Sequence, residues 1–234
     1  MSARLPVVIL AGGVATRLRP LTETIPKALV DVNGTPFVDH QLGLLRANGV
    51  DRVIICAAHL GGMIQEHVGE GNRFGLRVTV AFDGPRLLGT GGAIKAALPL
   101  LGDAFFVLYG DSYLDCDYAA VQARFAECGK LGLMTVFANE GRWETSNVEY
   151  AGGGIVAYDK RHPTPRMHHV DYGLGVFAAA AFTGFRERDS FDLAELYQDL
   201  LTRRELAAYE VAERFYEIGS FAGLEETRRH LARR

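Results

Sequence analysis

Short β-branched runs alternate with amphipathic segments in the first half of the chain, and this rhythm constrains the fold more than any other feature of the sequence. Strand-like runs occur at residues 7–10, 52–58, 76–82 and 104–109. Apolar residues recur at helical spacing between these runs, at residues 38–45, 63–68 and 91–101. Because strands that alternate with helices join a parallel sheet through right-handed crossovers, the pattern predicts an α/β fold.

Beyond residue 115 the rhythm changes to helices mixed with shorter strand-like pieces. We expect helices at 118–128, 192–201 and 220–231, the last two capped by Asp192 and Ser220. Strands are expected at 131–138, 147–150, 154–158, 170–177, 207–211 and 214–218. With 234 residues and no low-complexity linker, the chain is predicted to form one domain over residues 1–234, with a soft division near residue 115.

The charge balance and the cysteines exclude several classes of protein. Lys and Arg number 25 while Asp and Glu number 28, so the net charge is −3 and no nucleic-acid footprint is expected. No apolar stretch reaches the roughly 18 residues of a membrane span. Three scattered cysteines indicate reduced thiols and a cytoplasmic protein, not a disulfide framework. The basic cluster Arg228, Arg229, Arg233 and Arg234 is interpreted as a helix end, where cations favour the helix dipole.

A glycine turn follows the first strand and carries fixed positive charge. It reads Gly12-Gly13-Val14-Ala15-Thr16-Arg17-Leu18-Arg19-Pro20-Leu21-Thr22, and Pro26-Lys27 follows. Glycines let backbone N–H groups approach phosphate oxygens, and Thr16, Arg17 and Lys27 add a hydroxyl and two cations. Neither the dinucleotide pattern G-x-G-x-x-G nor the P-loop pattern G-x-x-x-x-G-K is present. The turn therefore indicates a phosphate site of another kind.

The glycine turn and its flanks, residues 10–29, resemble the signature of the sugar-1-phosphate nucleotidylyltransferases, Gly-Gly-x-Gly-Thr-Arg-Leu-x-Pro-Leu-Thr followed by Pro-Lys. Later segments resemble the family's other motifs, in order, along nearly the whole chain. They are residues 88–93 for the base- and ribose-binding turn, Gly110-Asp111 for the metal-binding aspartate, Asp159-Lys160 for the Glu-Lys pair, 171–174 for the sugar pocket and 215–219 for the second metal ligand. The first motif is highly specific, and the last three are individually weak.

The resemblance implies a Rossmann-like three-layer mixed sheet of the nucleotide-diphospho-sugar transferase (GT-A-like) type. Residues 1–115 would form its nucleotide-binding part and residues 116–234 its sugar-phosphate-binding part. The implied reaction is Mg²⁺-dependent transfer of a nucleotidyl group from a nucleoside triphosphate (NTP) to a sugar 1-phosphate, with release of pyrophosphate. The implied catalytic residues are Arg17 and Lys27; the nucleotide-binding residues are Ala11, Gly12, Gly13, Thr16, Arg17, Gly89, Thr90 and Asp111; the sugar-phosphate-binding residues are Tyr109, Lys160, Asp171 and Gly173; the Mg²⁺ ligands are Asp111 and Glu217.

The residues themselves agree with this chemistry. Two polyanionic substrates can be brought together only if cations bind to each of them. Phosphoryl transfer depends on positioning and charge stabilisation and does not require a protein nucleophile. Gly12 follows the first strand and Asp111 the fourth, so both are expected at the carboxyl edge of a parallel sheet, where such sheets bind ligands. The sequence therefore predicts that the glycine turn, Asp111 and Glu217 face one cavity.

Four residues depart from the family pattern. Ala15 replaces a usual glycine, which costs about 1–2 kcal/mol if the backbone is left-handed there. Glu217 replaces Asp and is expected to shift the metal or hold it through water. Asp171 replaces Asn, so it should accept bonds from sugar hydroxyls or favour a cationic group. Tyr109 stands where relatives often have Asn.

Several alternatives stay open. The chain is similar to small guanylyltransferases of heptose or mannose 1-phosphate, closely followed by uridylyltransferases of amino sugars such as N-acetylmuramate 1-phosphate. A cytidylyltransferase of a non-sugar phosphate, a catalytically silent nucleotide-sugar-binding subunit and homo-oligomerisation are not excluded, whereas no membrane partner is expected.

Four further features have competing interpretations. Asp115-Cys116-Asp117 matches the D-x-D of glycosyltransferases, but a helix N-cap at Asp117 is favoured. His168-His169 is interpreted as a surface pair, because no third metal ligand lies at a suitable spacing. Trp143 is expected either to roof the sugar pocket or to pack on its rim. Asp83 is interpreted as a turn residue in preference to a reader of guanine.

Overall fold

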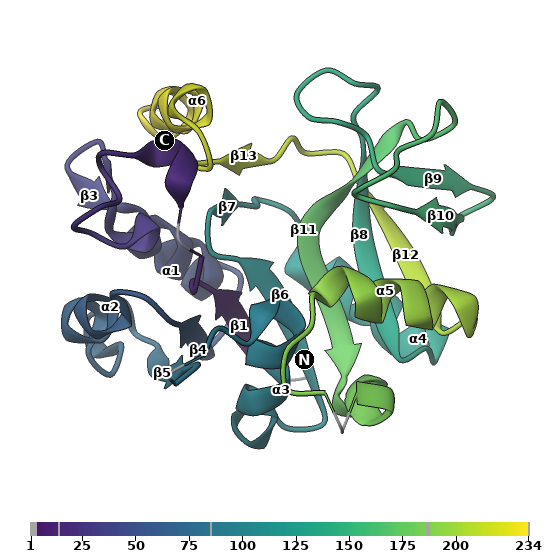
Figure 1. Ribbon diagram of the computed structural model, residues 1–234, viewed down its shortest axis with the longest axis horizontal. Helices are drawn as coiled ribbons and strands as arrows, with labels where there is room; N and C mark the ends of the chain where they lie inside the picture. Colours follow the sequence, from purple (N-terminus) through teal and green to yellow (C-terminus); the bar gives the residue numbers. More distant parts are fainter. Residues whose placement is uncertain (1–3, 14, 85, 186–187, 234) are drawn as a thin grey trace.

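The computed structural model describes residues 4–13, 15–84, 86–185 and 188–233 (Figure 1). Val14 of the glycine turn and Arg234 of the basic cluster lie outside these ranges. The strands are β1 (Val7–Leu10), β2 (Asp31–Val32), β3 (Thr35–Pro36), β4 (Arg52–Ala57), β5 (Arg77–Phe82), β6 (Ala104–Tyr109), β7 (Ser112–Tyr113), β8 (Gly132–Ala138), β9 (Val148–Ala151), β10 (Gly154–Tyr158), β11 (His169–Ala178), β12 (Leu206–Val211) and β13 (Tyr216–Glu217). The α-helices are α1 (Phe37–Ala47), α2 (Gly61–Val68), α3 (Gly89–Leu101), α4 (Tyr118–Cys128), α5 (Leu193–Thr202) and α6 (Phe221–Leu231), and 3-10 turns lie at Thr16–Leu18, Lys27–Leu29, Asn72–Phe74 and Ala179–Phe185.

A mixed sheet of nine strands organises the described residues. Its strand order is β10-β9-β11-β6-β1-β4-β5, and β8 pairs with β11 and with β12 beside that path. Strands β5, β4, β1 and β6 are parallel, as their alternation with helices predicted. Strand β11 runs antiparallel to β6 and joins the second half of the chain to the first. The predicted Rossmann-like mixed sheet is confirmed.

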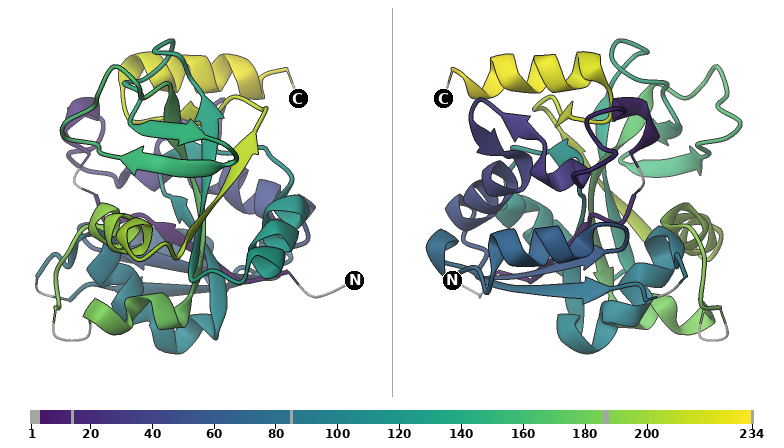
Figure 2. Two further views of the ribbon diagram at one scale, coloured as in Figure 1. Left: turned by 90° about the vertical axis from the view of Figure 1, so that its right-hand side faces the viewer. Right: turned by 60° about the vertical axis from the view of Figure 1, so that its left-hand side comes forward.

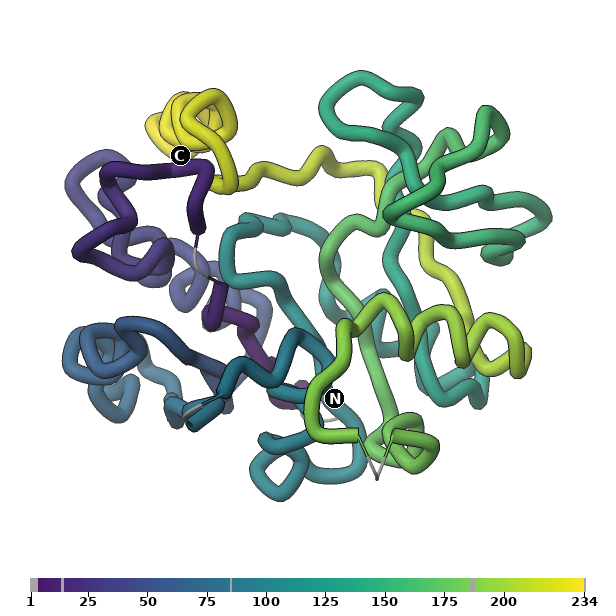
Figure 3. The backbone as a smooth tube through the Cα atoms, viewed as in Figure 1, coloured from purple at the N-terminus to yellow at the C-terminus, as the bar shows by residue number. Residues whose placement is uncertain are grey.

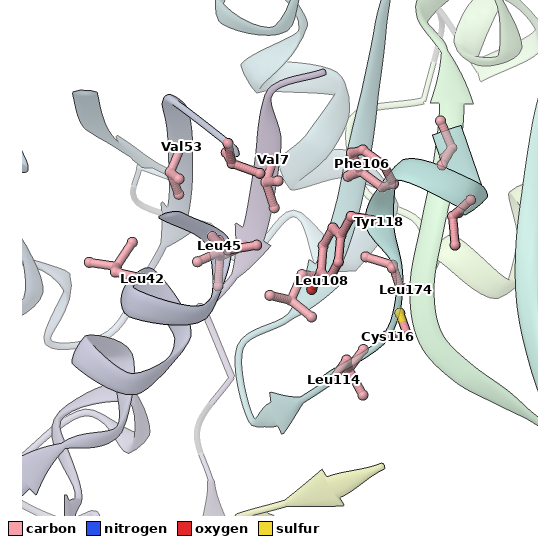
Figure 4. Close-up of a cluster of buried hydrophobic side chains, with 14 of the residues drawn as sticks. Val7, Leu42, Leu45, Val53, Phe106, Leu108, Leu114, Cys116, Tyr118 and Leu174 are labelled. Carbon is pink, nitrogen blue, oxygen red and sulfur yellow. The ribbon is translucent and has the colours of Figure 1, made fainter. Parts of the chain in front are cut away.

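Helices cover both faces of this sheet (Figure 2). Val7 and Ile9 of β1 pack in the core that contains α1, α2 and α4, whereas Val8 packs in the core that contains α3 and α5. Figure 4 shows part of the first core, where the rings of Phe106 and Tyr118 lie 5.4 Å apart. Strand β1 is buried on both faces, which explains its uniformly apolar sequence.

A third, smaller core joins the two ends of the chain. Leu18 of the first loop packs in one cluster with Ile218 and with Leu224 of α6. The amide of Asn33 donates to the carbonyl of Arg228 at 2.8 Å. Figure 3 shows the first loop lying beside the last helix, although the two are far apart in the sequence. This contact places the glycine turn next to β13.

The expected helices and strands are present, most with ends shifted by no more than two residues. One expectation was wrong in extent: the strand expected at 214–218 is only Tyr216–Glu217, because its partner β7 also has two residues. The small β2–β3 and β7 strands were not predicted. No helix among the described residues combines the length and the apolar character that spanning a bilayer requires.

Candidate active site

The glycine turn is held by short-range bonds at the end of β1. Ala15 has φ 50° and ψ 43°, the left-handed conformation considered from the sequence. The buried hydroxyl of Thr22 donates to the carbonyl of Ala15 at 2.7 Å, which explains a threonine at the end of the motif. The Ala11 N–H donates to the carbonyl of Cys56 on the neighbouring strand β4 at 2.8 Å. The turn is therefore fixed to the sheet at its start and across its bend.

A cavity of about 330 Å³ opens beside this turn, at the carboxyl ends of β1, β4 and β6. This volume is within the usual range for small-molecule sites. Six of the predicted nucleotide-binding residues line it, whereas Thr16 and Arg17 do not. The lining residues are Leu10, Ala11, Gly12, Gly13, Lys27, Ala28, Cys56, Asp83, Leu87, Gly89, Thr90, Ala93, Tyr109, Gly110 and Asp111.

Four charged residues from distant parts of the chain meet at the edge of this cavity. The ammonium of Lys27 contacts the Asp111 carboxylate at 2.9 Å. Strand β13 pairs with β7 so that Glu217 stands opposite Ser112, and the Ile218 N–H donates to the carbonyl of Asp111 at 2.9 Å. A Cβ atom on Gly219 would overlap the Glu217 carboxylate and would lie 3.0 Å from Arg17 Nη2. Arg17, Lys27, Asp111 and Glu217 therefore converge, and we call them the charged cluster.

The two carboxylates of the charged cluster suit a magnesium ion. Mg²⁺ is commonly bound in proteins by one or two carboxylates, and substrate phosphates and water complete its octahedron. Glu217 accepts hydrogen bonds from the Gly219 N–H and from the Ser220 hydroxyl, which orient its carboxylate. Within the described residues no group of three or more His, Cys, Asp or Glu forms a complete protein cage. The donor set thus fits a metal that bound phosphates would help to hold.

A second cluster surrounds Lys160, and we call it the lysine cluster. The Lys160 ammonium lies 3.1 Å from the Tyr109 hydroxyl and 3.5 Å from the Asp171 carboxylate. It also lies over the rings of Tyr109 and Tyr158, 4.8 Å and 5.9 Å from their centroids. Burial lowers the pKa of Lys160, but the neighbouring Tyr109 and Asp171 raise it by more, so its pKa is raised overall. The lysine therefore stays cationic at neutral pH.

Asp171 acts inside the lysine cluster. Its side chain is only 2% exposed. Its carboxylate accepts hydrogen bonds from the Tyr158 hydroxyl at 3.4 Å and from the Gly173 N–H at 3.1 Å. These hydrogen bonds and the Lys160 ammonium compensate the negative charge of the Asp171 carboxylate. Asp171 therefore helps to fix the position of the Lys160 ammonium.

Tyr109 connects the two clusters. It ends β6, lines the cavity, and reaches Lys160 with its hydroxyl. Its ring lies against Gly173, which has φ 99° at a register shift in β11. The buried Gln41 side chain donates to the carbonyls of Tyr109 and Ser112 at 3.2 Å and 2.8 Å, so it fixes the loop that carries Asp111. No motif in the sequence indicated Gln41.

The glycines at the start of α3 serve two purposes. Gly89 and Thr90 line the cavity, as predicted. Gly91 and Gly92 instead lie against the segment before α5, because a Cβ atom would overlap the Phe191 ring or the Asp189 carbonyl. The Thr90 hydroxyl accepts a bond from the Leu193 N–H at 2.8 Å. Part of the glycine pattern is therefore explained by packing.

The remaining sequence features have structural roles. Asp117 caps α4 by accepting from the Ala120 N–H at 3.0 Å, so the D-x-D match is explained by the favoured N-cap. His169 pairs with Glu210 at 3.2 Å. Asp159 accepts from the N–H groups of His162 and Arg161, which lower its pKa and shape the turn beside Lys160.

Trp143 packs against Phe137, with ring centroids 5.6 Å apart. The guanidinium groups of Arg142 and Arg214 lie 4.9 Å and 4.6 Å from its ring. Its neighbour Glu144 was missed by sequence reasoning, since it belongs to no motif. Partial burial raises the pKa of Glu144, and the charges of Glu217, Asp171 and Asp111 raise it further, while Lys160 lowers it. Glu144 thus lies close enough to both clusters to be affected by their charges.

Comparison with known proteins places this sequence in a family. A sequence model described as nucleotidyl transferase matches residues 6–149. The N-acetylmuramate alpha-1-phosphate uridylyltransferase of Neisseria meningitidis serogroup B is 40% identical over 114 residues, which are 48% of this chain and 49% of that protein. The D-glycero-alpha-D-manno-heptose 1-phosphate guanylyltransferase of Campylobacter jejuni is 25% identical over 213 residues, which are 91% of this chain and 93% of that protein.

The fold is also shared with solved structures. A candidate glucose-1-phosphate thymidylyltransferase from Bacillus anthracis superposes with a TM-score of 0.86 at 20% identity, over 97% of this chain and 95% of that one. At this identity the likeness concerns the fold. The chain spans between 35% and 60% of the length of three curated relatives, the Neisseria protein among them.

Proposed function

The chain belongs to the nucleotidyl transferase family, and on that premise we propose that it transfers a nucleotidyl group from a nucleoside triphosphate to a sugar 1-phosphate. The observation that carries the proposal is the meeting of Lys27, Asp111, Glu217 and Arg17 beside the cavity. Tyr109 links this charged cluster to Lys160, so cations are available for two separate phosphate groups.

The reaction is an in-line exchange at the α-phosphorus. An oxygen of the sugar phosphate forms a bond to that phosphorus, and the bond to the oxygen bridging the α- and β-phosphorus breaks, so pyrophosphate leaves. Lys160 holds the attacking phosphate, Arg17 stabilises the leaving pyrophosphate, and Lys27 lies between them. Such chemistry depends on positioning and on charge stabilisation in the transition state.

We propose Mg²⁺ as the cofactor, held by Asp111 and Glu217. When bound, the ion would neutralise charge on the triphosphate and help to orient it. The longer side chain of Glu217, compared with the family's usual aspartate, is held by Gly219 and Ser220 at the place where β13 meets β7.

We propose guanine as the base, with Asp83, which the sequence favoured as a turn residue, also reading its edge. Asp83 lines the cavity and accepts from the Leu88 N–H at 3.2 Å. Its other carboxylate oxygen is an acceptor, and the Watson–Crick edge of guanine presents two adjacent donors, whereas uracil presents one. The acceptor is proposed to be heptose or mannose 1-phosphate, which agrees with the names of two relatives. The alternative is a uridylyl transfer to an amino-sugar phosphate, which agrees with the name of the Neisseria relative.

A pyrophosphate-release assay tests the proposal. The protein is mixed with Mg²⁺ and each of GTP, UTP, CTP and ATP, against mannose, heptose, glucose and N-acetylglucosamine 1-phosphates. We expect release with GTP and a manno-configured acceptor, and the Asp83→Asn variant should lose the preference for GTP over UTP. No release with any pair would overturn the proposal, and binding without turnover would support a silent nucleotide-sugar-binding subunit.

The role of Arg17 has its own test. Arg17→Ala should lower kcat by about 100-fold, because removing one donor from developing charge costs about this much. Arg19→Ala, an exposed neighbour, is the control and should keep its rate. An unchanged rate in Arg17→Ala would remove that side chain from the mechanism.

A further inference from the structure

The short loop from β6 to β7 carries Asp111 and leads into the strand that pairs with Glu217. Strand β6 ends at Tyr109 and β7 starts at Ser112, so Asp111 and one glycine make up the whole connection. In the β7–β13 pair, Ser112 stands opposite Glu217. The places of both proposed metal ligands therefore depend on how this loop is held.

One buried side chain of α1 spans the loop. The amide nitrogen of Gln41 donates to the Tyr109 carbonyl at 3.2 Å and to the Ser112 carbonyl at 2.8 Å, at the two ends of the loop. Because carbonyl oxygens only accept hydrogen bonds, the group of Gln41 that faces them must be its NH₂. Leu42 and Leu45 of the same helix are fully buried, so the side chain extends from an element that the core holds in place.

Other contacts fix the remainder of the loop backbone. The Gly110 N–H donates to the Leu10 carbonyl at 3.0 Å, and a Cβ atom on Gly110 would overlap that carbonyl. The Asp111 carbonyl accepts from the Ile218 N–H at 2.9 Å. An aspartate has only two rotatable side-chain bonds, so the place of its carboxylate follows closely from the place of its backbone. These bonds and those of Gln41 therefore decide where the Asp111 carboxylate lies.

Core packing does not explain a glutamine at position 41. Gln41 is 1% exposed, and its buried amide oxygen accepts no hydrogen bond from any residue that the structure describes. A buried acceptor without a donor is unfavourable, and an apolar side chain of similar size, such as methionine, would avoid it. What glutamine supplies, and methionine does not, is the pair of hydrogen bonds to the loop.

We propose that Gln41 is a positioning residue for the divalent metal, which holds Asp111 where its carboxylate and that of Glu217 can bind one ion. This inference rests on the proposed function, because it concerns the metal of the same site. Gln41 does not line the cavity, so it acts through the loop alone. Mg²⁺ demands near-ideal octahedral geometry, and a small displacement of one carboxylate therefore lowers the affinity.

Binding of Mn²⁺ to the protein alone, followed by electron paramagnetic resonance, tests the proposal without turnover. Dissociation constants are compared for wild type, Gln41→Met, Asp111→Asn and Gln122→Met. Gln122 is the matched control, because it is a helical glutamine whose side chain accepts from the Leu5 N–H at 3.0 Å, before the amino end of β1. We expect Gln41→Met to weaken binding by about tenfold, Asp111→Asn by at least as much, and Gln122→Met by less than about twofold.

A second variant, Gln41→Asn, guards against a change that only disturbs the core. It keeps an amide that is one methylene too short to reach both carbonyls, and it should weaken Mn²⁺ binding in the same way. Circular dichroism checks that each variant is folded. If both variants at this position lost the native spectrum, the two hydrogen bonds would serve stability, and the positioning role would be overturned.

The remaining outcomes also decide the proposal separately from the reaction. An unchanged dissociation constant in Gln41→Met or in Asp111→Asn, an equal weakening in Gln122→Met, or absence of Mn²⁺ binding by wild type would overturn it. Absence of pyrophosphate release would refute the proposed function, while the Mn²⁺ comparison would still decide the role of Gln41. Where turnover occurs, the Mg²⁺ concentration for half-maximal rate should rise in Gln41→Met, and saturating Mg²⁺ should restore kcat.

Discussion

Ala15 keeps a left-handed backbone in the glycine turn without the freedom of glycine. Its φ of 50° costs about 1–2 kcal/mol for a residue with a Cβ atom. Ala15→Gly should remove that cost, partly offset by the larger entropy of the unfolded chain, for a net gain of about 0.5–1 kcal/mol. Urea unfolding measures the free energy change. In the control Ala123→Gly, at an exposed position in α4, the same substitution should cost about 0.5–1 kcal/mol. Equal signs for the two variants would contradict the argument.

The Tyr109 hydroxyl can be tested for a contribution to acceptor binding alone, separate from the triphosphate. Tyr109→Phe keeps the ring beside Gly173 and removes the hydroxyl that lies 3.1 Å from Lys160. We expect KM for the sugar 1-phosphate to rise about tenfold and KM for the triphosphate to change by less than about twofold, because a hydrogen bond to a charged group is lost only on the acceptor side. Steady-state kinetics with each substrate varied separate the two constants. Tyr150→Phe in β9 is the control. A rise in both constants would show that Tyr109 acts on the cavity as a whole.

At the scale of single residues, the sequence motifs predicted which charged side chains come close together. The glycine turn, Asp111 and Glu217 were expected to face one cavity; the turn, Lys27 and Asp111 line it, whereas Glu217 lies next to it on the strand that pairs with β7. Glu144 was not predicted, because its place depends on contacts of its neighbours with Arg214 and Asp171, which are distant in sequence. A loop residue without periodicity or a motif carries no local signal of such contacts.

Among the elements, long periodic segments were predicted well and short ones poorly. Helix α4 was predicted with its observed ends, because Asp117 caps it and Gly129 follows it in the left-handed conformation. Strands β7 and β13 have two residues each, too few for alternation to define their ends, and they are held by pairing across about a hundred residues. The strand carrying Glu217 was therefore expected in place but overestimated in length.

The start of α3 offers a prediction at the scale of the element. Gly92→Ala should destabilise the fold by about 1–3 kcal/mol, since its Cβ atom would overlap the backbone carbonyl of Asp189 and overpacking costs about this much. Gly43→Ala in α1 has open space and should stabilise by about 0.5–1 kcal/mol. Urea midpoints of the two variants measure the difference. If both variants gained stability, the segment before α5 would not pack on α3 as described.

For the molecule as a whole, the fold class followed from the rhythm of strands and helices, but the way its halves join did not. Parallel order among β1, β4, β5 and β6 was expected from the helical crossovers. The antiparallel insertion of β11 between β6 and β8 could not be predicted, because its pairs with β6 join residues about 70 apart and no tight turn sets its register. This insertion gives both proposed halves of the site one continuous sheet.

That continuity predicts a single cooperative unfolding transition. Trp143 is the only tryptophan, so its fluorescence reports the second half of the chain, whereas far-ultraviolet circular dichroism reports both halves. Because β6 pairs with β11 and β7 with β13, neither half can unfold without exposing strand edges and core of the other. The two urea midpoints should coincide, as two-state unfolding requires. Saturating GTP should move both midpoints equally, although the cavity lies in the first half, since a ligand of the native state stabilises the whole cooperative unit. Two separate midpoints, or a shift confined to circular dichroism, would mean that residues 1–115 and 116–234 behave as independent units.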